Sequence, residues 1–282
     1  MAKHFVSIKI NAEKGEGKEL RTKYGVGGFP TLLLVDAKGE EVDRIVGFRP
    51  PDKFIAALKP ILAGDSFGAL KKKAAASPDD LTTALAYAKK LEERRRGKDA
   101  EAIYRRVAGS EEAPAALRVE ARGRLAIVAF TSSRGKNVTP LEKFFDENKS
   151  SKAAVEPARM LFSFYQGQKK NERAVAMGDW LLANGLDGDS QFLNNYAWFL
   201  ATHDLHLKRA RKLAKKAVKL SPRAPHILDT LAEAYHRNGE HARAVKAQKK
   251  ALGLVSGTQR KQYEERLAEF EAALEKTGSS SK

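Results

Sequence analysis

The stretch from Leu228 to Ala251 reads LDTLAEAYHRNGEHARAVKAQKKA, and its spacing of apolar and small residues decides most of the fold. Leu231 and Tyr235 recur with the period of a helix that buries one face. Gly239 interrupts this pattern, and a second helical period follows with the small residue Ala244, which lets two helices approach closely. The stretch therefore predicts two antiparallel helices joined by a turn at the glycine.

The same pattern occurs 34 residues upstream, beginning near Gln191. Ala210 then aligns with Ala244, and Ala217 aligns with Ala251. The length and the small residues resemble the tetratricopeptide repeat, a helical hairpin of about 34 residues. The resemblance implies that stacked hairpins share one core and that their first helices line a concave surface, which commonly binds other polypeptides.

Weaker copies of the hairpin precede these two. Thr83–Val107 and Ala158–Leu181 carry apolar and small residues at matching spacings, and Ala115–Phe130 with Leu141–Phe145 predicts an irregular hairpin between them. Thr258–Lys276 has one apolar stripe opposite a charged face, which is typical of a terminal capping helix.

The first 63 residues follow a different pattern. Phe5–Ile10 alternates with period two and predicts a half-buried strand, and Lys18–Tyr24 predicts a short helix. Thr31–Val35 is the length of a strand buried on both faces, and Glu41–Phe48 predicts a second strand that completes a hairpin with it. Lys53–Leu62 predicts an amphipathic helix.

These elements, with the segment GVGGFPT at residues 25–31, the turn Asp36–Gly39 and the pair Gly47-Phe48, resemble the second half of a thioredoxin domain. The resemblance implies that Pro30 is the cis-proline of that family. It also implies that Phe29 and Pro30 present their backbone to a bound extended peptide. The alternative is a conformational proline that only starts a strand.

The chain departs from that family before the Phe5 strand, where the resemblance implies a strand, a Cys-x-x-Cys motif and a long helix. The sequence contains no cysteine, so no dithiol chemistry is expected. The strand at Phe5 and the strand at Thr31 would then face a gap with unpaired backbone groups. We considered a truncated gene start, a strand donated by a partner, and pairing of the Phe5 strand with the Thr31 strand. Truncation is the favoured origin, and direct pairing is the favoured structure of the chain as given.

The expected fold class is α/β plus all-α. An incomplete thioredoxin-like βαββα layer is expected at residues 1–63, a linker at 64–80, a tetratricopeptide-type α-solenoid with its capping helix at 81–276, and a disordered tail at 277–282.

The first helices of the last hairpins supply the candidate groove. Asn194 and Asn195 are candidates for holding a peptide backbone through their amides, and the alternative is that they cap the helix of Trp198. The predicted groove residues are Asn194, Asn195, Trp198, His226, Asp229, Glu233 and His236.

The formal net charge is +17, and the calculated isoelectric point is about 9.9. Lys and Arg are spread over most helices, so binding to nucleic acid is not favoured, although it stays open as an alternative. One basic stripe on a second helix either binds an acidic partner or is a solvated face, and solvation is favoured. The stripe consists of Lys208, Arg211, Lys212, Lys215 and Lys219.

Several kinds of site are not expected. His203 and His206 have metal-ligand spacing, but no third ligand has a convincing place, so neither metal nor cofactor is expected. No phosphate-binding loop and no span of about 18 apolar residues occur. The start of the chain shows no signal peptide, which predicts a cytoplasmic protein, or a periplasmic or secreted one if the true start lies upstream.

The sequence therefore predicts a non-catalytic adaptor that binds a protein or peptide through the helical repeats. The alternative is a truncated thiol–disulfide oxidoreductase whose Cys-x-x-Cys lies upstream, since the resemblance implies disulfide chemistry of the kind found in bacterial envelopes or cytoplasm. Exposed strand edges also make a homodimer an open alternative.

Overall fold

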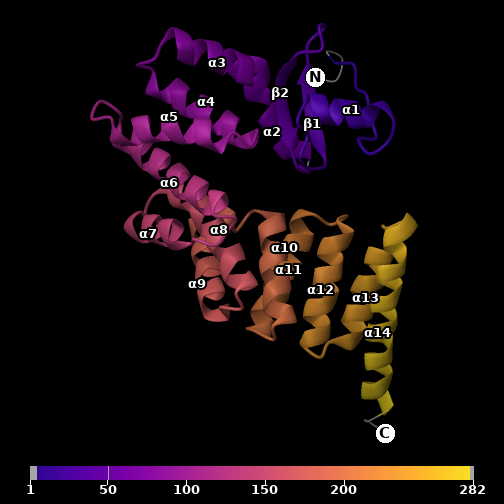
Figure 1. The fold of residues 1–282 in the computed structure, drawn as a ribbon. Coiled ribbons are helices and arrows are strands. Elements are labelled where there is room, and N and C mark those ends of the chain that lie inside the picture. Colours follow the sequence, from indigo (N-terminus) through magenta and orange to yellow (C-terminus); the bar gives the residue numbers. More distant parts are fainter. Residues whose placement is uncertain (1–4, 50, 280–282) are drawn as a thin grey trace. The chain divides into compact units, whose positions relative to one another are not determined.

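The computed structural model of the protein describes residues 5–49 and 51–279 (Figure 1). Contacts divide the chain into two compact units, Met1–Ala153 and Ala154–Lys282. We describe each unit by itself. No helix in the described ranges is long and apolar enough to cross a membrane.

The N-terminal unit begins with a small sheet and its helices. Strands β1 and β2 form an antiparallel hairpin in which Thr31 faces Val46, and the turn between the strands places Gly39 at a φ of 74°. The Tyr24 hydroxyl donates to the Gly39 carbonyl at 2.8 Å and so fixes the turn against the end of α1. The elements are α1 (Glu16–Lys23), β1 (Thr31–Val35), β2 (Glu41–Val46), α2 (Pro51–Pro60) and a kinked turn (Ile61–Asp65) in which Gly64 has a φ of 96°.

Residues 5–10 do not form the predicted strand. Within the described ranges the sheet has two strands, and no backbone hydrogen bond involves residues 5–10. Alternating apolar residues specify which face of a strand would be buried, but a strand also needs a neighbouring edge to receive its hydrogen bonds. The expected direct pairing of the Phe5 segment with the Thr31 strand is therefore wrong. The thioredoxin-like layer consists of α1, β1, β2 and α2.

Five helices complete the N-terminal unit. The predicted linker at residues 64–80 contains helix α3, which begins at the N-cap Ser66 and packs against β2 and α4. The boundary between the two compact units lies at residue 153. The helices are α3 (Phe67–Ala76), α4 (Leu81–Glu93), α5 (Gly97–Gly109), α6 (Ala115–Ser132) and α7 (Thr139–Glu147).

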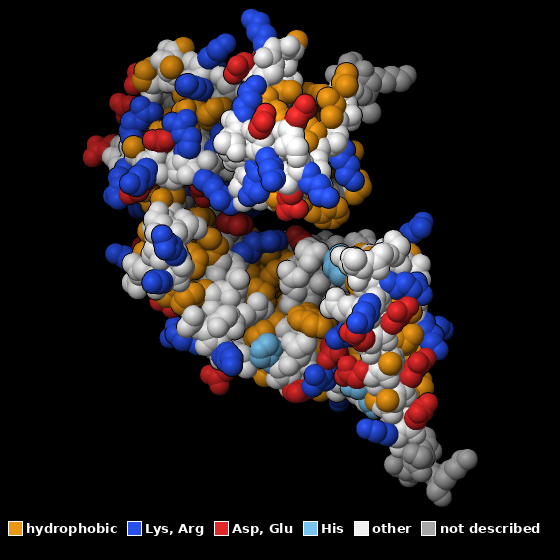
Figure 2. Space-filling model, turned by 45° about the vertical axis from the view of Figure 1, so that its right-hand side comes forward, with side chains coloured by type: hydrophobic (Ala, Val, Ile, Leu, Met, Phe, Trp, Pro, Cys, Tyr) orange, Lys and Arg blue, Asp and Glu red, His pale blue; other side chains and the backbone are white. Residues whose placement is uncertain are grey.

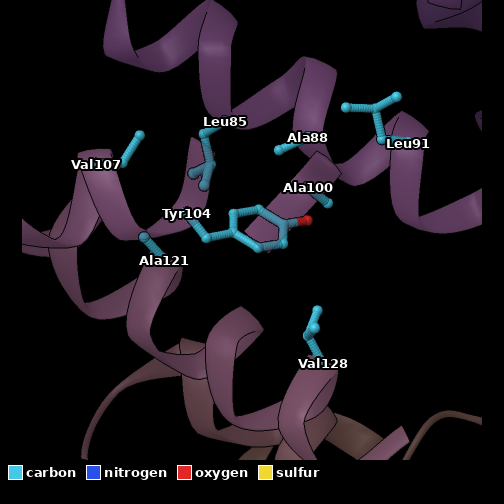
Figure 3. Packing of buried hydrophobic residues seen from close by; sticks show 8 residues of the cluster. All are labelled: Leu85, Ala88, Leu91, Ala100, Tyr104, Val107, Ala121 and Val128. Atoms are coloured by element: carbon cyan, nitrogen blue, oxygen red, sulfur yellow. The ribbon is translucent and has the colours of Figure 1, made fainter. Parts of the chain in front are cut away.

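Tyr104 lies at the centre of the core of this unit (Figure 3). Its ring is buried among side chains of α4, α5 and α6, and its hydroxyl donates to Glu92 at 2.8 Å. Burial raises the pKa of the Tyr104 hydroxyl, and the neighbouring Glu92 carboxylate raises it further. The surrounding cluster consists of Leu85, Ala88, Leu91, Ala100, Val107, Ala121 and Val128.

The C-terminal unit is a succession of antiparallel helices (Figure 1). Helices α8 and α9, α10 and α11, and α12 and α13 pack as hairpins, and α14 packs against α13. The helices are α8 (Val155–Gly167), α9 (Asn171–Leu181), α10 (Ser190–Thr202), α11 (Leu207–Leu220), α12 (Pro225–Arg237), α13 (His241–Leu252) and α14 (Arg260–Ser279). A kinked turn in which Gly185 has a φ of 103° lies at Leu182–Leu186, and turns of 3₁₀ helix lie at Lys152–Ala154 and Gly257–Gln259.

The repeat spacing explains how these hairpins close. Ala210 and Ala217 on α11 are fully buried, and so are their counterparts Ala244 and Ala251 on α13. Side chains of this size allow close contact between paired helices. The predicted capping helix corresponds to α14, which reaches Ser279 and so includes three residues of the predicted tail. Residues 280–282 lie outside the described ranges.

Candidate binding groove

The C-terminal unit has a groove of about 660 Å³ on the face formed by the first helices of its hairpins. Figure 2 shows hydrophobic and histidine side chains on the hollowed face of this unit. The walls come from α8, α10, α12 and α14, and His203 follows α10 directly. The lining residues are Arg159, Phe162, Ser163, Gln166, Phe192, Asn194, Asn195, Trp198, Phe199, Thr202, His203, His226, Asp229, Thr230, Gln262, Tyr263 and Arg266.

Amide side chains form a hydrogen-bonded chain along one part of the groove. The Nε2 atom of Gln191 donates to Oδ1 of Asn195 at 2.9 Å, and Nε2 of His226 lies 3.1 Å from Oε1 of Gln191. Because that oxygen can only accept, Nε2 carries the imidazole proton. Burial lowers the pKa of His226, although the nearby Asp229 raises it in part. The imidazole is therefore held in its neutral form near pH 7.

Asn194 stands out within this chain of amides. It is 7% exposed, and its Nδ2 atom donates to Oδ1 of Asn195 at 3.5 Å. Its own Oδ1 is buried and accepts no hydrogen bond from any residue in the described ranges. A buried acceptor without a donor costs about 1–3 kcal/mol, so this oxygen is a place where a ligand N–H would be favourable.

Arg266, on α14, lines the groove and donates hydrogen bonds to two carboxylates of α12. Its Nε donates to Asp229 at 2.7 Å, and its second terminal nitrogen donates to Glu233 at 2.8 Å. The guanidinium carbon also lies 5.1 Å from the ring centroid of Trp198, which is 36% exposed. The cation is therefore neutralised by two carboxylates while it fixes the indole that remains open to the groove.

An aromatic cluster supports the floor. The ring centroid of Phe162 lies 5.6 Å from Phe192, 5.5 Å from Tyr196 and 6.0 Å from Phe199. Tyr196 is fully buried; its hydroxyl donates to Asp179 at 2.5 Å and lies 3.1 Å from the Val175 carbonyl oxygen. Such edge-to-face contacts hold α8 against α10 and keep the groove preformed.

The structure brings together five of the seven predicted groove residues and leaves out two. Glu233 is 4% exposed and is engaged by Arg237 and Arg266, so it supports the groove without lining it. Burial raises the pKa of Glu233, but the hydrogen bonds and charges of these arginines outweigh it and lower the pKa overall. The imidazole of His236 packs against Phe270 and His241, away from the lining. The predicted residues that line the groove are Asn194, Asn195, Trp198, His226 and Asp229.

Asn194 and Asn195 do not cap their helix. The N-cap of α10 is Asp189, whose carboxylate accepts from the backbone N–H groups of Gln191 and Phe192 at 3.0 Å. The same carboxylate pairs with Arg159 at 3.0 Å. The capping alternative is therefore wrong, and both asparagines lie within the helix.

Sequence reasoning missed the lining residues of α8 and α14. Arg159, Gln262, Tyr263 and Arg266 belong to helices that were predicted only as a degenerate repeat and as a cap. The repeat spacing did contain a signal, since α14 follows α13 in the place where the first helix of a further hairpin would stand. A first helix in that place contributes to the concave face.

The other predicted sites lie elsewhere. Phe29 is exposed, the peptide bond between Phe29 and Pro30 is cis, and both residues belong to the N-terminal unit. On the basic stripe, Arg211 pairs with Glu240 across the neighbouring hairpin. Throughout the described ranges, no three His, Asp or Glu side chains are placed to hold a metal ion.

The start of the chain and its helical region resemble different known proteins. Residues 2–61 match the thioredoxin-like domain family. No curated protein sequence gives a significant match.

The helical region resembles solved structures at low sequence identity. YrrB, a tetratricopeptide repeat protein with an unusual peptide-binding site, is 14% identical, with coverage of 70% of this chain and 97% of that one at a TM-score of 0.50. BtubC from P. vanneervenii is 16% identical, with 67% and 86% coverage and a TM-score of 0.51. MamA from Desulfovibrio magneticus RS-1 is 16% identical, with 62% and 95% coverage and a TM-score of 0.48. The chain therefore carries a thioredoxin-like domain at residues 2–61, followed by a helical region with the fold of tetratricopeptide repeat proteins.

Proposed function

We propose that this protein is a non-catalytic adaptor whose C-terminal unit binds an extended segment of another polypeptide along the groove. The observation that carries the proposal is Asn194, a buried side chain in the groove lining whose Oδ1 accepts no hydrogen bond within the described ranges. An extended peptide supplies backbone N–H donors at regular intervals. It can therefore satisfy this oxygen while it also exchanges hydrogen bonds with the neighbouring amides.

The arrangement of the lining helices suits a linear ligand. Four helices contribute, α8, α10, α12 and α14, which alternate along the chain with α9, α11 and α13. Helices that pack side by side lie about 8–10 Å apart, so the groove extends over roughly 24–30 Å. An extended chain rises about 3.3 Å per residue, which corresponds to roughly seven to nine residues of ligand. A groove open along its length accepts such a segment without requiring a chain end.

The chemistry of the lining favours an uncharged ligand with an apolar side chain near Trp198. The two carboxylates of Asp229 and Glu233 already engage Arg266, and Asp189 engages Arg159. Few unpaired charges therefore remain for an ionic ligand. The exposed indole of Trp198 offers a rigid apolar surface of the kind that dominates binding energy at interfaces.

The fold and the composition also support this proposal. YrrB shares the helical fold and is described as having a peptide-binding site, which supports the same class of ligand here. The thioredoxin-like part has no thiol, because the 282 residues include no cysteine. We therefore assign the thioredoxin-like part no dithiol–disulfide exchange, which requires a thiolate.

Selection from a phage-displayed library of random twelve-residue peptides, with the full-length chain as bait, tests the proposal. Selected peptides are then titrated into a Trp180→Phe variant, in which Trp198 is the only tryptophan and reports on the groove directly. We expect Asn194→Ala to weaken binding about tenfold, since one lost hydrogen bond is worth about 1–1.5 kcal/mol. Trp198→Ala removes this reporter, so its binding is measured by titration calorimetry, and it should be weaker by at least about 2 kcal/mol, roughly thirtyfold, as expected for an aromatic hot spot.

A matched control lies on the opposite face of the same unit. Lys219→Ala removes an exposed side chain of α11 outside the groove lining, and it should leave the affinity unchanged. Selected peptides that bind Asn194→Ala and Trp198→Ala as tightly as the unmodified groove would refute the proposal. Peptides whose binding depends on Lys219 but not on Asn194 would do the same.

A further inference from the structure

Each strand of the two-stranded sheet in the N-terminal unit has an outer edge without a backbone partner in the described ranges. The β1 edge is the one without charged residues, whereas β2 contains Glu41, Asp43 and Arg44. The Gly47 N–H donates to the Pro30 carbonyl at 2.8 Å, so Pro30 and Gly47 form a hydrogen-bonded pair. Along an antiparallel ladder, residue pairs that hydrogen-bond to each other alternate with pairs that do not. The backbone groups of Thr31, Leu33 and Val35 consequently point away from β2. In the part of the chain that the structure describes, no other strand or backbone group receives them.

Exposed apolar side chains are concentrated in the same region. Of the fifteen large hydrophobic side chains that are exposed in the described ranges, eleven lie between residues 5 and 62. Figure 2 shows hydrophobic side chains on the surface of this unit. A two-stranded hairpin is marginally stable by itself, and Leu32, Val35 and Val46 of this one are exposed. These exposed residues are Phe5, Val6, Ile8, Ile10, Phe29, Leu32, Val35, Val46, Phe48, Ile55 and Leu62.

The chain also contains a strand sequence that is not in a sheet. In residues 5–10, Val6, Ile8 and Ile10 would lie on one face of a strand, and Ser7 and Lys9 would lie on the other. Val6 is 90% exposed and Ile8 is 77% exposed, and the backbone of the segment makes no hydrogen bond within the described ranges. The segment thus has the pattern of a strand and lacks an edge to pair with.

We propose that two copies of this chain exchange strands, so that residues 5–10 of each copy pair with the open β1 edge of the other. Each copy has one unpaired edge without charged residues, that of β1, and one unpaired strand, so a two-fold arrangement pairs the two with each other in both copies. The occupant of the edge is therefore a second copy, because the complementary strand is present in the same sequence.

The charge of the chain is compatible with contact at this place. The net charge of +17 opposes association in general. Strand β1 contains no charged residue, and Lys9 is the one charged residue of residues 5–10, so the pairing surfaces themselves add little repulsion. Because salt screens the remaining charge, the dimer should become tighter as ionic strength rises.

The oligomeric state of the full-length chain, measured by sedimentation equilibrium, tests the proposal. The double variant V6K/I8K places two charges on the donated strand, and both positions are solvent-exposed, so the variant keeps its fold. We expect a dimer for the unmodified chain and a monomer for V6K/I8K. The control Leu220→Lys introduces a charge at an exposed apolar position of α11 and should remain dimeric.

Mixing separates strand exchange from any other dimer. Leu33→Pro removes the N–H that points out of the open edge and leaves residues 5–10 intact. Neither Leu33→Pro nor V6K/I8K should dimerise alone, yet an equimolar mixture should form a heterodimer, because one competent strand and one competent edge remain. Amide exchange should show protection at Leu33 and Val35 in the unmodified chain and its loss in V6K/I8K.

Three outcomes would overturn the proposal. A monomeric unmodified chain at all measured concentrations, or a V6K/I8K variant that dimerises like the unmodified chain, overturns the proposal. Protection at Leu33 that persists in monomeric V6K/I8K also overturns it, since the edge would then be covered from within one chain. The inference does not depend on the groove, and its failure leaves the proposed peptide binding unaffected.

Discussion

The guanidinium carbon of Arg94 lies 3.9 Å from the ring centroid of Phe67, and the same guanidinium donates to Asp43 at 2.9 Å. Arg94 follows α4, Phe67 begins α3 and Asp43 lies on β2. Asp43 is fully buried and also pairs with Lys90 at 2.9 Å. Glu41 accepts a further hydrogen bond from Arg94 at 2.7 Å. This network joins the thioredoxin-like hairpin to the first helices of the helical region within one compact unit.

Replacing Asp43 by Ala should destabilise the N-terminal unit by about 3–5 kcal/mol, because Arg94 and Lys90 would each lose a carboxylate partner in a buried site. Hydrogen exchange of peptides that cover β2 and α4 measures the effect. The exposed pair Asp65 and Lys73 provides the control, since Asp65→Ala should cost about 0–1 kcal/mol. Equal losses from the two variants would contradict a structural role for the network.

The sequence predicted the hairpin and missed its surroundings for a physical reason. The continuous apolar run at Thr31–Val35 and the turn at Gly39 are local signals, and both elements occur. The Phe5–Ile10 pattern is also local, but a strand requires an edge elsewhere in the chain. The role of Asp43 depends on a contact with Arg94, 51 residues away, and no local pattern encodes such a pairing.

Gly178 should resist substitution because it lets α9 approach Tyr196. A Cβ atom at this glycine would lie 2.5 Å from the Tyr196 ring. The ring has little room to move aside, because it is fully buried and its hydroxyl is hydrogen-bonded. Gly178→Ala should therefore destabilise the C-terminal unit by about 1–3 kcal/mol through overpacking. Urea unfolding followed by tryptophan fluorescence measures this unit alone, because both tryptophans, Trp180 and Trp198, belong to it.

Gly167 at the end of α8 is the matched control for that experiment. A Cβ atom there would meet no atom within 4 Å, and the φ angle is not in the left-handed region. Gly167→Ala should be neutral or stabilise the helix by up to about 1 kcal/mol through helix propensity. Equal behaviour of the two variants would mean that the space at Gly178 is not needed.

The groove could be predicted in part. The repeat period placed Asn194, Trp198, His226 and Asp229 on first helices, and a first helix faces the concave side in a stacked array. The period does not distinguish a residue that lines the groove from one that supports it, which is why Glu233 was misplaced. Arg266 escaped notice because its partners, Asp229 and Glu233, come from a helix more than thirty residues away.

Removing Arg266 should destabilise the C-terminal unit in a pH-dependent way. At pH 7, Arg266→Ala should cost up to about 3 kcal/mol, because Glu233 is buried and keeps only Arg237 as a partner. The pKa of Glu233 in the folded chain lies below its ordinary value of 4.5. Its contribution is therefore present above pH 4.5 and is lost as the pH falls through the lower folded value.

The measurement is urea unfolding of the unmodified chain and of Arg266→Ala between pH 3 and 7. The difference in unfolding free energy between them should shrink at the acid end of this range. Lys261→Ala, on the same helix in an exposed pair with Glu265, should change the stability by about 0–1 kcal/mol at any pH. A difference that stays constant down to pH 3 would show that the Glu233 contact does not stabilise the folded unit.

His236 should make the C-terminal unit less stable in mild acid. Burial lowers the pKa of this imidazole below its ordinary value of 6.5, and His241 and Arg237 lower it further, although Glu233 and Glu269 partly oppose them. The unfolded chain therefore binds a proton before the folded chain does, and stability falls as the pH drops from about 6.5 toward the folded pKa. His236→Phe keeps an aromatic ring against Phe270 and removes the titration, so its unfolding free energy should vary less across this window. Tryptophan-monitored urea unfolding at several values between pH 5 and 7.5 measures both slopes, and identical slopes would exclude His236 as the titrating group.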